Sequence, residues 1–526
     1  MSFRDDADAM TLALAQTPNW ARVRGDLDDA ALRDILTEAA KCAETVVAPL
    51  DAAADRIGAR VVDGHVVLPP GYHAAYGAMA QAGWIGLEHP EARGGMGLPL
   101  TLFAAVDPLF ERASVAFMMA AGGSRAAALL LEEWADEALK ADWVPALIAG
   151  ERCATICISE PGAGSDLGRI RTRATQGPDG GWQVSGQKIW ISFGDHDLRE
   201  RIGHCLLART GEGIGTRGLS LFFVERGAGV SLERIEEKLG LHGSPTCALH
   251  FDKAPARLIG AEGRGLAQLF TMIRHMRLSV GCQGLGLALR ALDCARDHAA
   301  TRRQGGNPAA PPVPIITHPD VARQLRRMQM QVDLFRLALL ELATASDLAA
   351  ADPALGQFAQ WLAPLCKNFG AELGFETAAQ AVLVLGGVGV TRDYPVEQVL
   401  RDARVFAVYE GTTGMQGQDF LLRQSLADGC AKPALFFARA AEDLAAHPDA
   451  LAVVNDFRTL LEEVAAVGDR DLLALVCDDM MRAGWIAVQA WLAPRLGAHP
   501  SAREFMLTAR ARLAVHAAAV RGYLTA

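Results

Sequence analysis

The sequence lacks an excess of positive charge. Its 526 residues contain 51 Lys and Arg against 61 Asp and Glu, which gives a formal net charge of −10. Nucleic acids and anionic membrane surfaces need concentrated Lys and Arg, so we expect neither as the main partner. Ten cysteines are present without a C-x-x-C pair, and the closest two, Cys153 and Cys157, have no histidine pattern around them. This spacing favours free thiols in a reducing cytoplasm over disulfides or a metal site.

The sequence also lacks a recognisable export signal and a long uninterrupted apolar run. Its beginning, MSFRDDADAM, is acidic where a secretory or transit peptide would be basic and apolar. Apolar stretches such as 481–496 are interrupted by Arg and Pro before they reach the roughly eighteen residues of a membrane span. We therefore expect a cytoplasmic protein without a membrane segment.

What the sequence does contain predicts a mainly α fold with a β domain in the middle. The apolar fraction is 51%, and the length suggests roughly three or four domains. Apolar residues at three- and four-residue spacing predict an N-terminal helical domain over 1–150. Short β-rich runs between Gly, Asp and Pro predict a middle β-barrel-like domain over 151–262. Helical spacing then predicts a C-terminal four-helix bundle over 263–430, interrupted by a Pro-rich loop at 304–317, and an additional helical domain over 431–526.

Four segments carry the chemical information. They are ISEPGAGSD at 158–166, GQKIWIS at 186–192, LGGVGVTRDYPVEQ at 385–398 and RDARVFAVYEGTTGMQGQ at 401–418. The last presents one carboxylate, Glu410, inside an otherwise apolar and glycine-bounded run. YEG or GGVG alone is typical of an ordinary loop or a helix end. In this order and spacing, the four segments together resemble the acyl-CoA dehydrogenase family, flavoenzymes that introduce a double bond between the α and β carbons of a thioester.

Removal of an α proton from a thioester needs a base beside the acidic carbon and polarisation of the carbonyl oxygen. A carboxylate in a dry pocket suits the first task, because desolvation raises its pKa and makes it a stronger base. The resemblance implies that Glu410 is the catalytic base and that its backbone N–H belongs to the oxyanion hole. It also implies substrate contacts at Gly411, Ser165 and Arg277. Arg274 faces the same way by helical spacing, although an ordinary surface arginine would explain it equally well.

The same resemblance implies FAD as the cofactor, because a hydride must leave the β carbon as the α proton departs. Serine hydroxyls and loop amides can hydrogen-bond a flavin edge, and a tryptophan offers a stacking surface. Trp190 without its neighbours would be an ordinary strand aromatic, whereas Arg302 is a natural phosphate ligand. The expected FAD-binding residues are Ile158, Ser159, Gly164, Ser165, Trp190 and Ser192 from the β domain, and Arg302, Gln304, Gly387 and Thr412 from the bundle.

Two positions depart from the family pattern. Leu383 and Pro319 stand where many relatives have glutamines that contact a cofactor, so FAD affinity or dimer geometry is expected to differ. GGVG follows a helical pattern rather than a strand, so it is not a dinucleotide fingerprint. His196 and Asp197 lie on one short loop, where turn-stabilising polar groups are the commoner explanation, and we expect no metal.

Other segments, such as EKLGLHGSPTC at 237–247 and THPDV at 317–321, resemble a longer bacterial branch that includes methylmercaptopropionyl-CoA dehydrogenases and medium- or long-chain relatives. That resemblance implies an acyl-CoA substrate, an electron-transfer flavoprotein as acceptor and a homodimer. Two alternatives stay open, an alkylation-response type of DNA-associated flavoprotein and a flavin oxidase of the same fold. The final block has ten Lys and Arg against eleven Asp and Glu, so it lacks the clustered positive charge that DNA needs. Glutamate at 410, rather than aspartate, favours acyl-CoA chemistry over nitroalkane oxidation.

Overall fold

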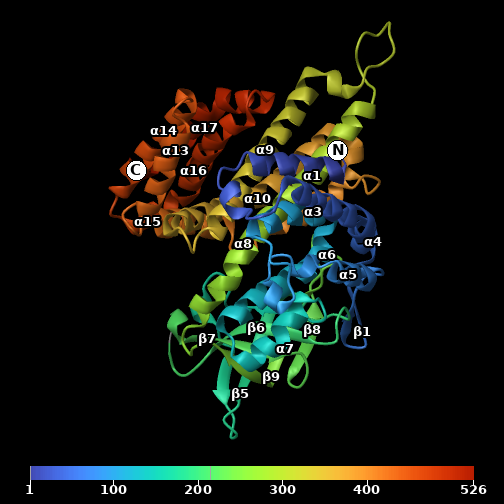
Figure 1. Ribbon diagram of the computed structural model, residues 1–526, viewed down its shortest axis with the longest axis vertical. Coiled ribbons are helices and arrows are strands. Elements are labelled where there is room, and N and C mark those ends of the chain that lie inside the picture. Colours follow the sequence, from blue (N-terminus) through green and yellow to red (C-terminus); the bar gives the residue numbers. More distant parts are fainter. Residues whose placement is uncertain (1, 214, 526) are drawn as a thin grey trace. The chain divides into compact units, whose positions relative to one another are not determined.

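A computed structural model describes residues 2–213 and 215–525 of the chain. The chain divides into two compact units that do not follow the order of the sequence. Helices α6 (Leu100–Trp134) and α8 (Gly265–Thr301) each run from one unit into the other (Figure 1). The first unit comprises Met1–Ala40, Pro99–Arg112 and Arg277–Ala526, and the second comprises Lys41–Leu98 and Ala113–Met276.

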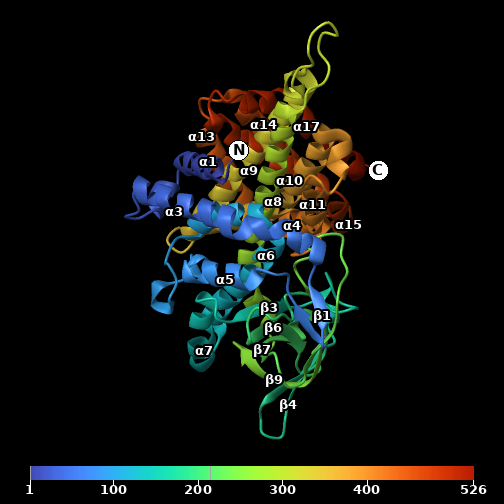
Figure 2. The ribbon, with the colours of Figure 1, turned by 90° about the vertical axis from the view of Figure 1, so that its right-hand side faces the viewer.

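Seven strands of the second unit form its β domain (Figure 2). Strand β6 pairs with β7, β7 with β9, β9 with β5, and β5 with β4, and a parallel pair at Arg173 and Arg209 returns from β4 to β6. The pairings therefore close into a ring, which confirms the expected barrel-like domain, while β3 lies parallel to β6 and β8 pairs with β9. The strands are β3 (Cys153–Cys157), β4 (Arg173–Gln176), β5 (Trp182–Ser192), β6 (Ile202–Arg209), β7 (Leu219–Glu225), β8 (Val230–Ile235) and β9 (Thr246–Ile259).

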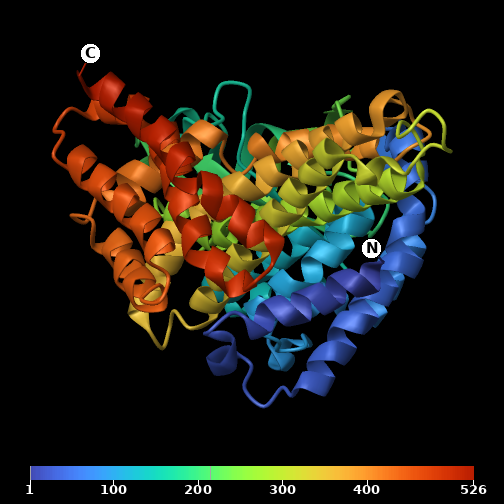
Figure 3. The same cartoon turned by 90° about the horizontal axis from the view of Figure 1, so that it is seen from above.

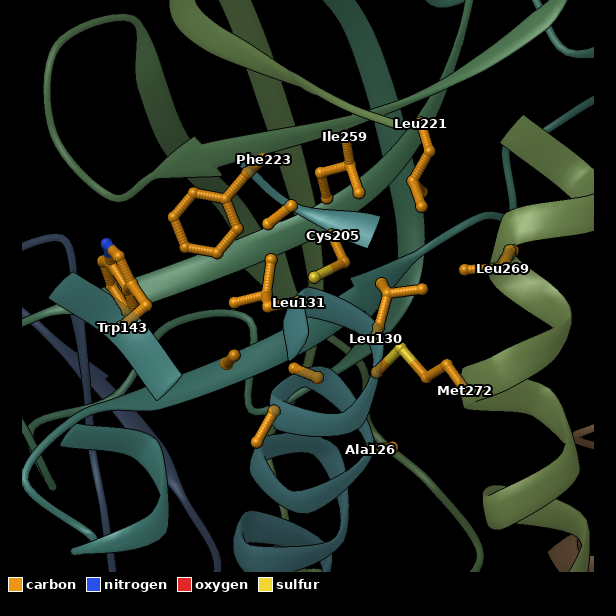
Figure 4. Close-up of a cluster of buried hydrophobic side chains, with 14 of the residues drawn as sticks. Ala126, Leu130, Leu131, Trp143, Cys205, Leu221, Phe223, Ile259, Leu269 and Met272 are labelled. Carbon is orange, nitrogen blue, oxygen red and sulfur yellow. The ribbon is translucent and has the colours of Figure 1, made fainter. Parts of the chain in front are cut away.

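Helices of the same unit contribute to a shared apolar core with this sheet (Figure 4). Leu130 and Leu131 reach it from α6 and Phe223 from β7. The ring of Trp143 meets that of Phe223 edge to face, with 4.7 Å between centroids. Burying one such large side chain contributes about 1.5–3 kcal/mol. The helical elements of this unit are η1 (Ala43–Val47), α4 (Ala48–Ile57), α5 (Tyr72–Gln81), η2 (Trp84–Gly86), η3 (Glu91–Arg93), α7 (Glu137–Ile148), η4 (Leu167–Arg169) and η5 (Gly215–Gly218).

A short hairpin inside the N-terminal helical region was not expected. Strands β1 (Arg60–Val62) and β2 (His65–Val67) pair antiparallel. The two residues between them, Asp63 and Gly64, both have positive φ, at 49° and 81°. Asp-Gly is the preferred pair for this kind of two-residue turn, so the signal was present in the sequence.

The regular elements of the first unit are all helices in the part of the chain that the structure describes. The long helices α8, α9 and α10 of the bundle are connected as predicted, with an irregular Pro-rich segment between α8 and α9. The elements are α1 (Phe3–Ala15), α2 (Trp20–Val23), α3 (Asp29–Cys42), η6 (Ile315–Thr317), α9 (Pro319–Asp347), α10 (Pro353–Leu385), η7 (Gly386–Val390), α11 (Val396–Ala403), η8 (Arg404–Ala407), α12 (Thr413–Gln418), η9 (Asp419–Ser425), α13 (Ala431–Asp443), α14 (Pro448–Ala465), α15 (Arg470–Leu475), α16 (Cys477–Leu492), η10 (Ala493–Leu496) and α17 (Pro500–Thr525).

The last helices, α13 to α17, pack beside the bundle helices of this unit (Figure 3). The buried carboxylate of Glu341 on α9 accepts hydrogen bonds from Arg439 on α13, at 3.0 Å, and from Arg495 on η10, at 2.5 Å. On α10, Glu372 accepts two hydrogen bonds from Arg482 of α16. Ion pairs from three elements of the C-terminal block thus reach two helices of the bundle.

Two helices are long and apolar enough to cross a membrane by length and composition, which corrects the expectation that no run approaches that length. They are Leu100–Trp134 and Pro353–Val390, with mean hydropathies of 1.4 and 1.5 in their most apolar windows. Charged residues interrupt both sequences without lowering the average far enough, which is why inspection for uninterrupted runs missed them. In the structure 78% of the first window is buried, as in a core helix of a folded protein, whereas 44% of the second is buried.

Candidate active site

The segment 404–418 builds a sharp turn that displays Glu410. Element η8 ends at Ala407, and the turn then continues to Thr412, the N-cap of α12. Glu410 has φ +52° and Gly411 has φ +95°. A left-handed conformation costs a residue other than glycine roughly 1–2 kcal/mol, so the surrounding structure must hold Glu410 in it. At Gly411 a β carbon would lie 2.7 Å from Nε2 of Gln416, so this position needs glycine for space as well as for φ.

Two side chains hold this turn. Nζ of Lys367, a fully buried residue of α10, donates to the carbonyl oxygens of Phe406 at 2.9 Å and Gly411 at 2.6 Å. Nε2 of Gln416 donates to the carbonyl oxygen of Glu410 at 3.0 Å. The backbone on both sides of the Glu410 side chain is therefore fixed to neighbouring helices.

The carboxyl group of Glu410 lies in a setting that suits a base. Within the described residues it accepts no hydrogen bond and forms no ion pair. Burial raises its pKa, while the positive charges of Lys367 and Arg277 act in the opposite direction. The pKa of Lys367 is itself lowered to about 7, because burial outweighs its attraction to Glu410. Glu410 is thus a carboxyl of raised proton affinity whose oxygens are not occupied by the protein.

Arg277, predicted as a substrate contact, is half-buried in α8. Its Nη1 donates to Oδ2 of Asp419 at 2.6 Å, and Asp419 begins η9, just after the segment that carries Glu410. The ion pair therefore joins α8 to the start of η9, just after the segment that carries Glu410. Arg274, one turn earlier on α8, is exposed. The positive charge of Arg277 lowers the pKa of Glu410, whereas Arg274 is an arginine on the surface.

Tyr409 anchors the turn from the other side. Its hydroxyl donates to Oε1 of Gln283 on α8, and its ring stacks on Phe406 with 5.9 Å between centroids. Burial raises the pKa of Tyr409 well above its ordinary value, and the charges of Glu111 and Glu410 add to that shift. The phenol therefore stays protonated and acts as a hydrogen-bond donor throughout the neutral range.

The second unit brings the two β-domain motifs side by side. The N–H of Ile189 donates to the carbonyl of Ser159 at 2.9 Å, and Nζ of the buried Lys188 donates to the carbonyl of Ile158 at 2.9 Å and to Glu160 at 2.8 Å. Glu160 in turn accepts from the backbone amides of residues 171 and 172. Ile158 and Ser159 are half-buried beside this network, whereas Gly164 and Ser165 are exposed on the following turn.

Trp190 is displayed on the surface of this unit by a β-bulge. The pairing of β5 with β9 shifts register between Lys188 and Ile191, and Trp190 has φ +65°. Its side chain is 58% exposed, which is unusual for a strand tryptophan, and Ser192 lies two residues further along β5. A large aromatic face left open in this way can be covered by a planar ring.

The remaining predicted cofactor residues lie at helix ends of the first unit. Arg302 and Gln304 follow α8 in the exposed Pro-rich segment, where Nη2 of Arg302 donates to Oε1 of Gln304 at 3.2 Å. Gly387 is exposed in η7, with open space at its Cα. A ring contact between His298 and Tyr394 joins the end of α8 to the segment that follows η7.

The two departures and the histidine loop can also be located. Leu383 is 70% exposed on α10, and Pro319 occupies the first turn of α9. His196 is buried, and its Nδ1 accepts a hydrogen bond from the N–H of Leu198, while Asp197 accepts from the N–H of Leu68. Within 2–213 and 215–525, no group of three or more His, Cys, Asp or Glu side chains could hold a metal ion.

Lys367, Lys188 and Gln416 were not identified from the sequence, although each makes hydrogen bonds that shape the candidate sites. A signal existed for both lysines. Lys367 interrupts the apolar stretch 361–371 of α10, and Lys188 precedes the apolar IWI run. A lone lysine among buried positions must find acceptors, which marks it as a residue with a defined partner.

The chain has a helical N-terminal part, a β-barrel-like middle and a helical bundle, which is the fold of the acyl-CoA dehydrogenases. The bundle carries a glutamate of raised pKa, Glu410. Family models for the N-terminal, middle and C-terminal domains of acyl-CoA dehydrogenase match residues 29–151, 155–254 and 263–422. The chain belongs to the acyl-CoA dehydrogenase family and is an oxidoreductase.

Relatives and solved structures agree with this assignment. The 3-methylmercaptopropionyl-CoA dehydrogenase of Ruegeria pomeroyi is 37% identical over 82% of this chain and 77% of its own length. A broad-specificity linear acyl-CoA dehydrogenase of Mycobacterium tuberculosis is 36% identical over 77% of this chain and 71% of its own. The structure of glutaryl-coenzyme A dehydrogenase with glutaryl-CoA matches with a TM-score of 0.67 at 27% identity, covering 77% of this chain and 97% of that one. A Bacillus anthracis acyl-CoA dehydrogenase complexed with FAD shares the fold, with a TM-score of 0.74 at 20% identity over 86% of this chain and 83% of that one.

FAD is the cofactor of this family and of this enzyme. The chain offers a donor set that fits it. The second unit presents the open face of Trp190, the Ser192 hydroxyl and the exposed turn at Gly164 and Ser165, which suit a planar ring with polar edges. The first unit presents the exposed guanidinium of Arg302, which suits a phosphate.

Proposed function

We propose that this enzyme oxidises an acyl-CoA thioester to the trans-2-enoyl-CoA and that Glu410 removes the α proton. The observation that carries the proposal is the state of this carboxyl group. It is held on a left-handed turn, it accepts no hydrogen bond from the described residues, and burial raises its pKa. A base of this kind loses no protein partner when it takes a proton, and its raised pKa strengthens it toward a carbon acid.

The backbone of the same residue suits the second task, polarisation of the thioester carbonyl. Within the described residues the N–H of Glu410 donates to no protein acceptor. A fixed N–H with no other partner stabilises an enolate oxygen without reorganisation, which is the property of an oxyanion-hole donor. We therefore assign it to the substrate carbonyl, with Gly411, Arg277 and Ser165 as further substrate contacts.

FAD, when bound, accepts the hydride that leaves the β carbon. The residues proposed to hold it are those of the two β-domain motifs, from Ile158 to Ser165 and at Trp190 and Ser192, together with Thr412, Gly387, Arg302 and Gln304. The likeness to the methylmercaptopropionyl-CoA and linear acyl-CoA enzymes supports a straight-chain or thioether acyl-CoA as substrate. An electron-transfer flavoprotein is the proposed acceptor and the cytoplasm the proposed location. A homodimer is also proposed, supported by the exposed apolar side chains of Leu383 and Val390.

Bleaching of the bound flavin tests the reaction. The purified holoenzyme is mixed without oxygen with straight-chain acyl-CoAs, including butyryl-CoA, and with 3-methylmercaptopropionyl-CoA. We expect rapid bleaching by at least one of them, and a loss of at least ~10³-fold in its rate in Glu410→Gln, because the amide cannot take the proton. Glu376→Gln is the matched control, since Glu376 on α10 is another carboxyl of raised pKa in the same unit. Wild-type bleaching by Glu410→Gln would overturn the assignment of the base.

The two alternatives give different results in the same preparation. A flavin oxidase would form stoichiometric hydrogen peroxide from oxygen during turnover with no other acceptor present. A DNA-associated flavoprotein would shift duplex DNA in a salt-sensitive manner. We expect neither result from the wild-type enzyme.

A further inference from the structure

Lys367 is a charged residue in a position where charge is costly. It lies in the middle of α10, its side chain is fully buried, and Cys366 and Phe369 beside it are buried as well. An ammonium group at such a site is retained only if its donors are satisfied and its charge has a counterpart. Lysine is also the basic side chain whose pKa responds most readily to burial.

The hydrogen bonds of Lys367 bracket the catalytic turn. Phe406 and Gly411, whose carbonyl oxygens accept from Nζ at 2.9 and 2.6 Å, stand on either side of Glu410 in the sequence. One side chain therefore links Phe406 of η8 to Gly411, on the two sides of Glu410. Since Glu410 has φ +52°, release of this closure would let the residue relax into a right-handed conformation and carry its carboxylate and its N–H away.

The charge of Lys367 acts on the same residue. Its field lowers the pKa of Glu410, against the larger effect of burial, and that of Arg277 acts in the same direction. Three other titratable groups belong to this turn or act on it or on Arg277. Asp419 of η9 neutralises Arg277, Tyr409 stays protonated, and Glu111 of α6 acts on Tyr409. Of the two cations that act on Glu410, Lys367 is thus the one whose charge is not already paired with another carboxylate in the described residues.

We propose that Lys367 is the positioning residue of the dehydrogenation: the hydrogen bonds of its Nζ hold the Glu410 turn in its left-handed form, and its positive charge favours the carboxylate form of Glu410. This inference rests on the function proposed above. It assigns two separable effects to one side chain, a geometric one through two donated hydrogen bonds and an electrostatic one through its charge. A lysine that only filled space in α10 would have neither effect on the base.

Two variants separate these effects. Lys367→Met keeps the length and apolar stem but removes donors and charge, and Lys367→Gln keeps donors but removes charge. Cys366→Ala is the control, because it trims a buried neighbour on the same helix that contacts Ala338 and not the turn. The rate of flavin bleaching in a single turnover is measured across pH with the best acyl-CoA of the panel, and FAD content and thermal midpoint are measured for each variant.

We expect the acid limb of the pH–rate profile to move upward by about one unit in both lysine variants, because loss of the positive charge raises the pKa of Glu410. Lys367→Met should in addition lose about tenfold or more at its pH optimum, whereas Lys367→Gln should retain most of that rate. Cys366→Ala should keep the wild-type limb. A role confined to packing would change the thermal midpoint and the FAD content but leave the limb in place.

The possible results decide between the proposals. If neither the wild type nor Cys366→Ala is bleached by any acyl-CoA, the proposed function fails. If both are bleached and the lysine variants show the wild-type limb, the assignment of Lys367 is overturned and the proposed function stands. If Lys367→Met does not fold, the limb of Lys367→Gln decides in the same way.

Discussion

At Glu410 the chain holds a carboxyl group whose burial and whose neighbours shift its pKa in opposite directions. Burial is the larger influence, so the native enzyme binds this proton more strongly than the unfolded chain does. A carboxyl of raised pKa contributes stability that is fully present below its ordinary pKa of 4.5 and is lost as pH rises through the raised pKa. The proposed base therefore costs the native state stability as pH rises through its raised pKa.

This linkage predicts how Glu410→Gln changes stability. Below the ordinary glutamate pKa of 4.5 both proteins carry a neutral group at position 410 in the native and in the unfolded state, so they should unfold alike. Above it the unfolded wild type gains free energy by ionising, whereas the native wild type must keep the proton or carry an unfavourable carboxylate, so the free energy of unfolding of the variant should exceed that of the wild type. Urea unfolding at about pH 5 and pH 8 measures the difference, which should grow with pH. A difference that shrinks with pH would show that Glu410 is stabilised as a carboxylate.

How far the sequence predicts the site depends on the residue. Glu410 could be singled out because an acidic residue between Tyr409 and Gly411 in an apolar run stands out by its type. Its left-handed φ could not, because nothing local distinguishes it from other loop glutamates. Lys367 is separated from it by over forty positions, and only the packing of α10 against the turn makes the two neighbours. Helical spacing placed Arg274 and Arg277 on one face, but the ion pair with Asp419 distinguishes them.

At the scale of elements, strand β5 and the turn that follows β3 are held together by buried hydrogen bonds. The bulge that displays Trp190 and the turn that displays Ser165 are joined through Lys188, which is buried and paired with Glu160. Burial lowers the pKa of Lys188, and the charge of Glu160 opposes that shift. Burial would likewise raise the pKa of Glu160, but its bonds to Lys188 and to backbone amides lower it. Each charge thus depends on its partner to remain ionised.

The pairing predicts the effect of Lys188→Met on the β domain. Removal of one member of a buried ion pair costs about 3–5 kcal/mol and leaves Glu160 without its cation. We expect the turn at 160–165 to loosen and the affinity for FAD to fall at least about tenfold, with the helical unit intact. Flavin fluorescence titration of the apoprotein measures the affinity, and urea unfolding measures the stability. Lys253→Met, at an exposed position of β9, should match the wild type in both; equal FAD affinity in the two variants would contradict the prediction.

The helices and strands were predictable where apolar residues recur at regular spacing over a long stretch of sequence. The change from helical spacing to short β-rich runs near residue 151, and back near 263, follows from the sequence, and so does the Pro-rich interruption after α8. The β1–β2 hairpin was missed because its three-residue strands are too short for a period, and only the Asp63–Gly64 turn indicated it. The bulge at Trp190 could not be predicted, since it depends on the register of β5 against β9.

At the scale of the molecule, the domain boundaries predicted along the sequence differ from the boundaries of the two compact units of the structure. The predicted boundaries at 150, 262 and 430 follow changes in the spacing of apolar residues along the chain, and they stay predictions. The division into two compact units instead places the N-terminal helices, the start of α6, the bundle and the last five helices together in the first unit. Such long-range association is absent from local sequence patterns, because it joins residues of separate helices, such as Glu341 and Arg439.

The carboxylate of Glu341 provides a test of how the C-terminal block is held to the bundle. It is fully buried and accepts from Arg439 and Arg495, so Glu341→Gln leaves Arg439 without its anion and Arg495 with Asp443 as its remaining carboxylate. We expect a loss of about 3–5 kcal/mol in the free energy of unfolding, because an uncompensated charge inside a protein is costly. The exposed pair of Arg521 and Glu463 is the matched control, and Glu463→Gln should cost less than about 1 kcal/mol. Urea unfolding followed by tryptophan fluorescence reports on both parts, since Trp361 lies in the bundle and Trp491 in the C-terminal block. If Glu341→Gln unfolded like Glu463→Gln, the apolar contacts alone would hold the block in place, and the ion pairs would contribute nothing to its attachment.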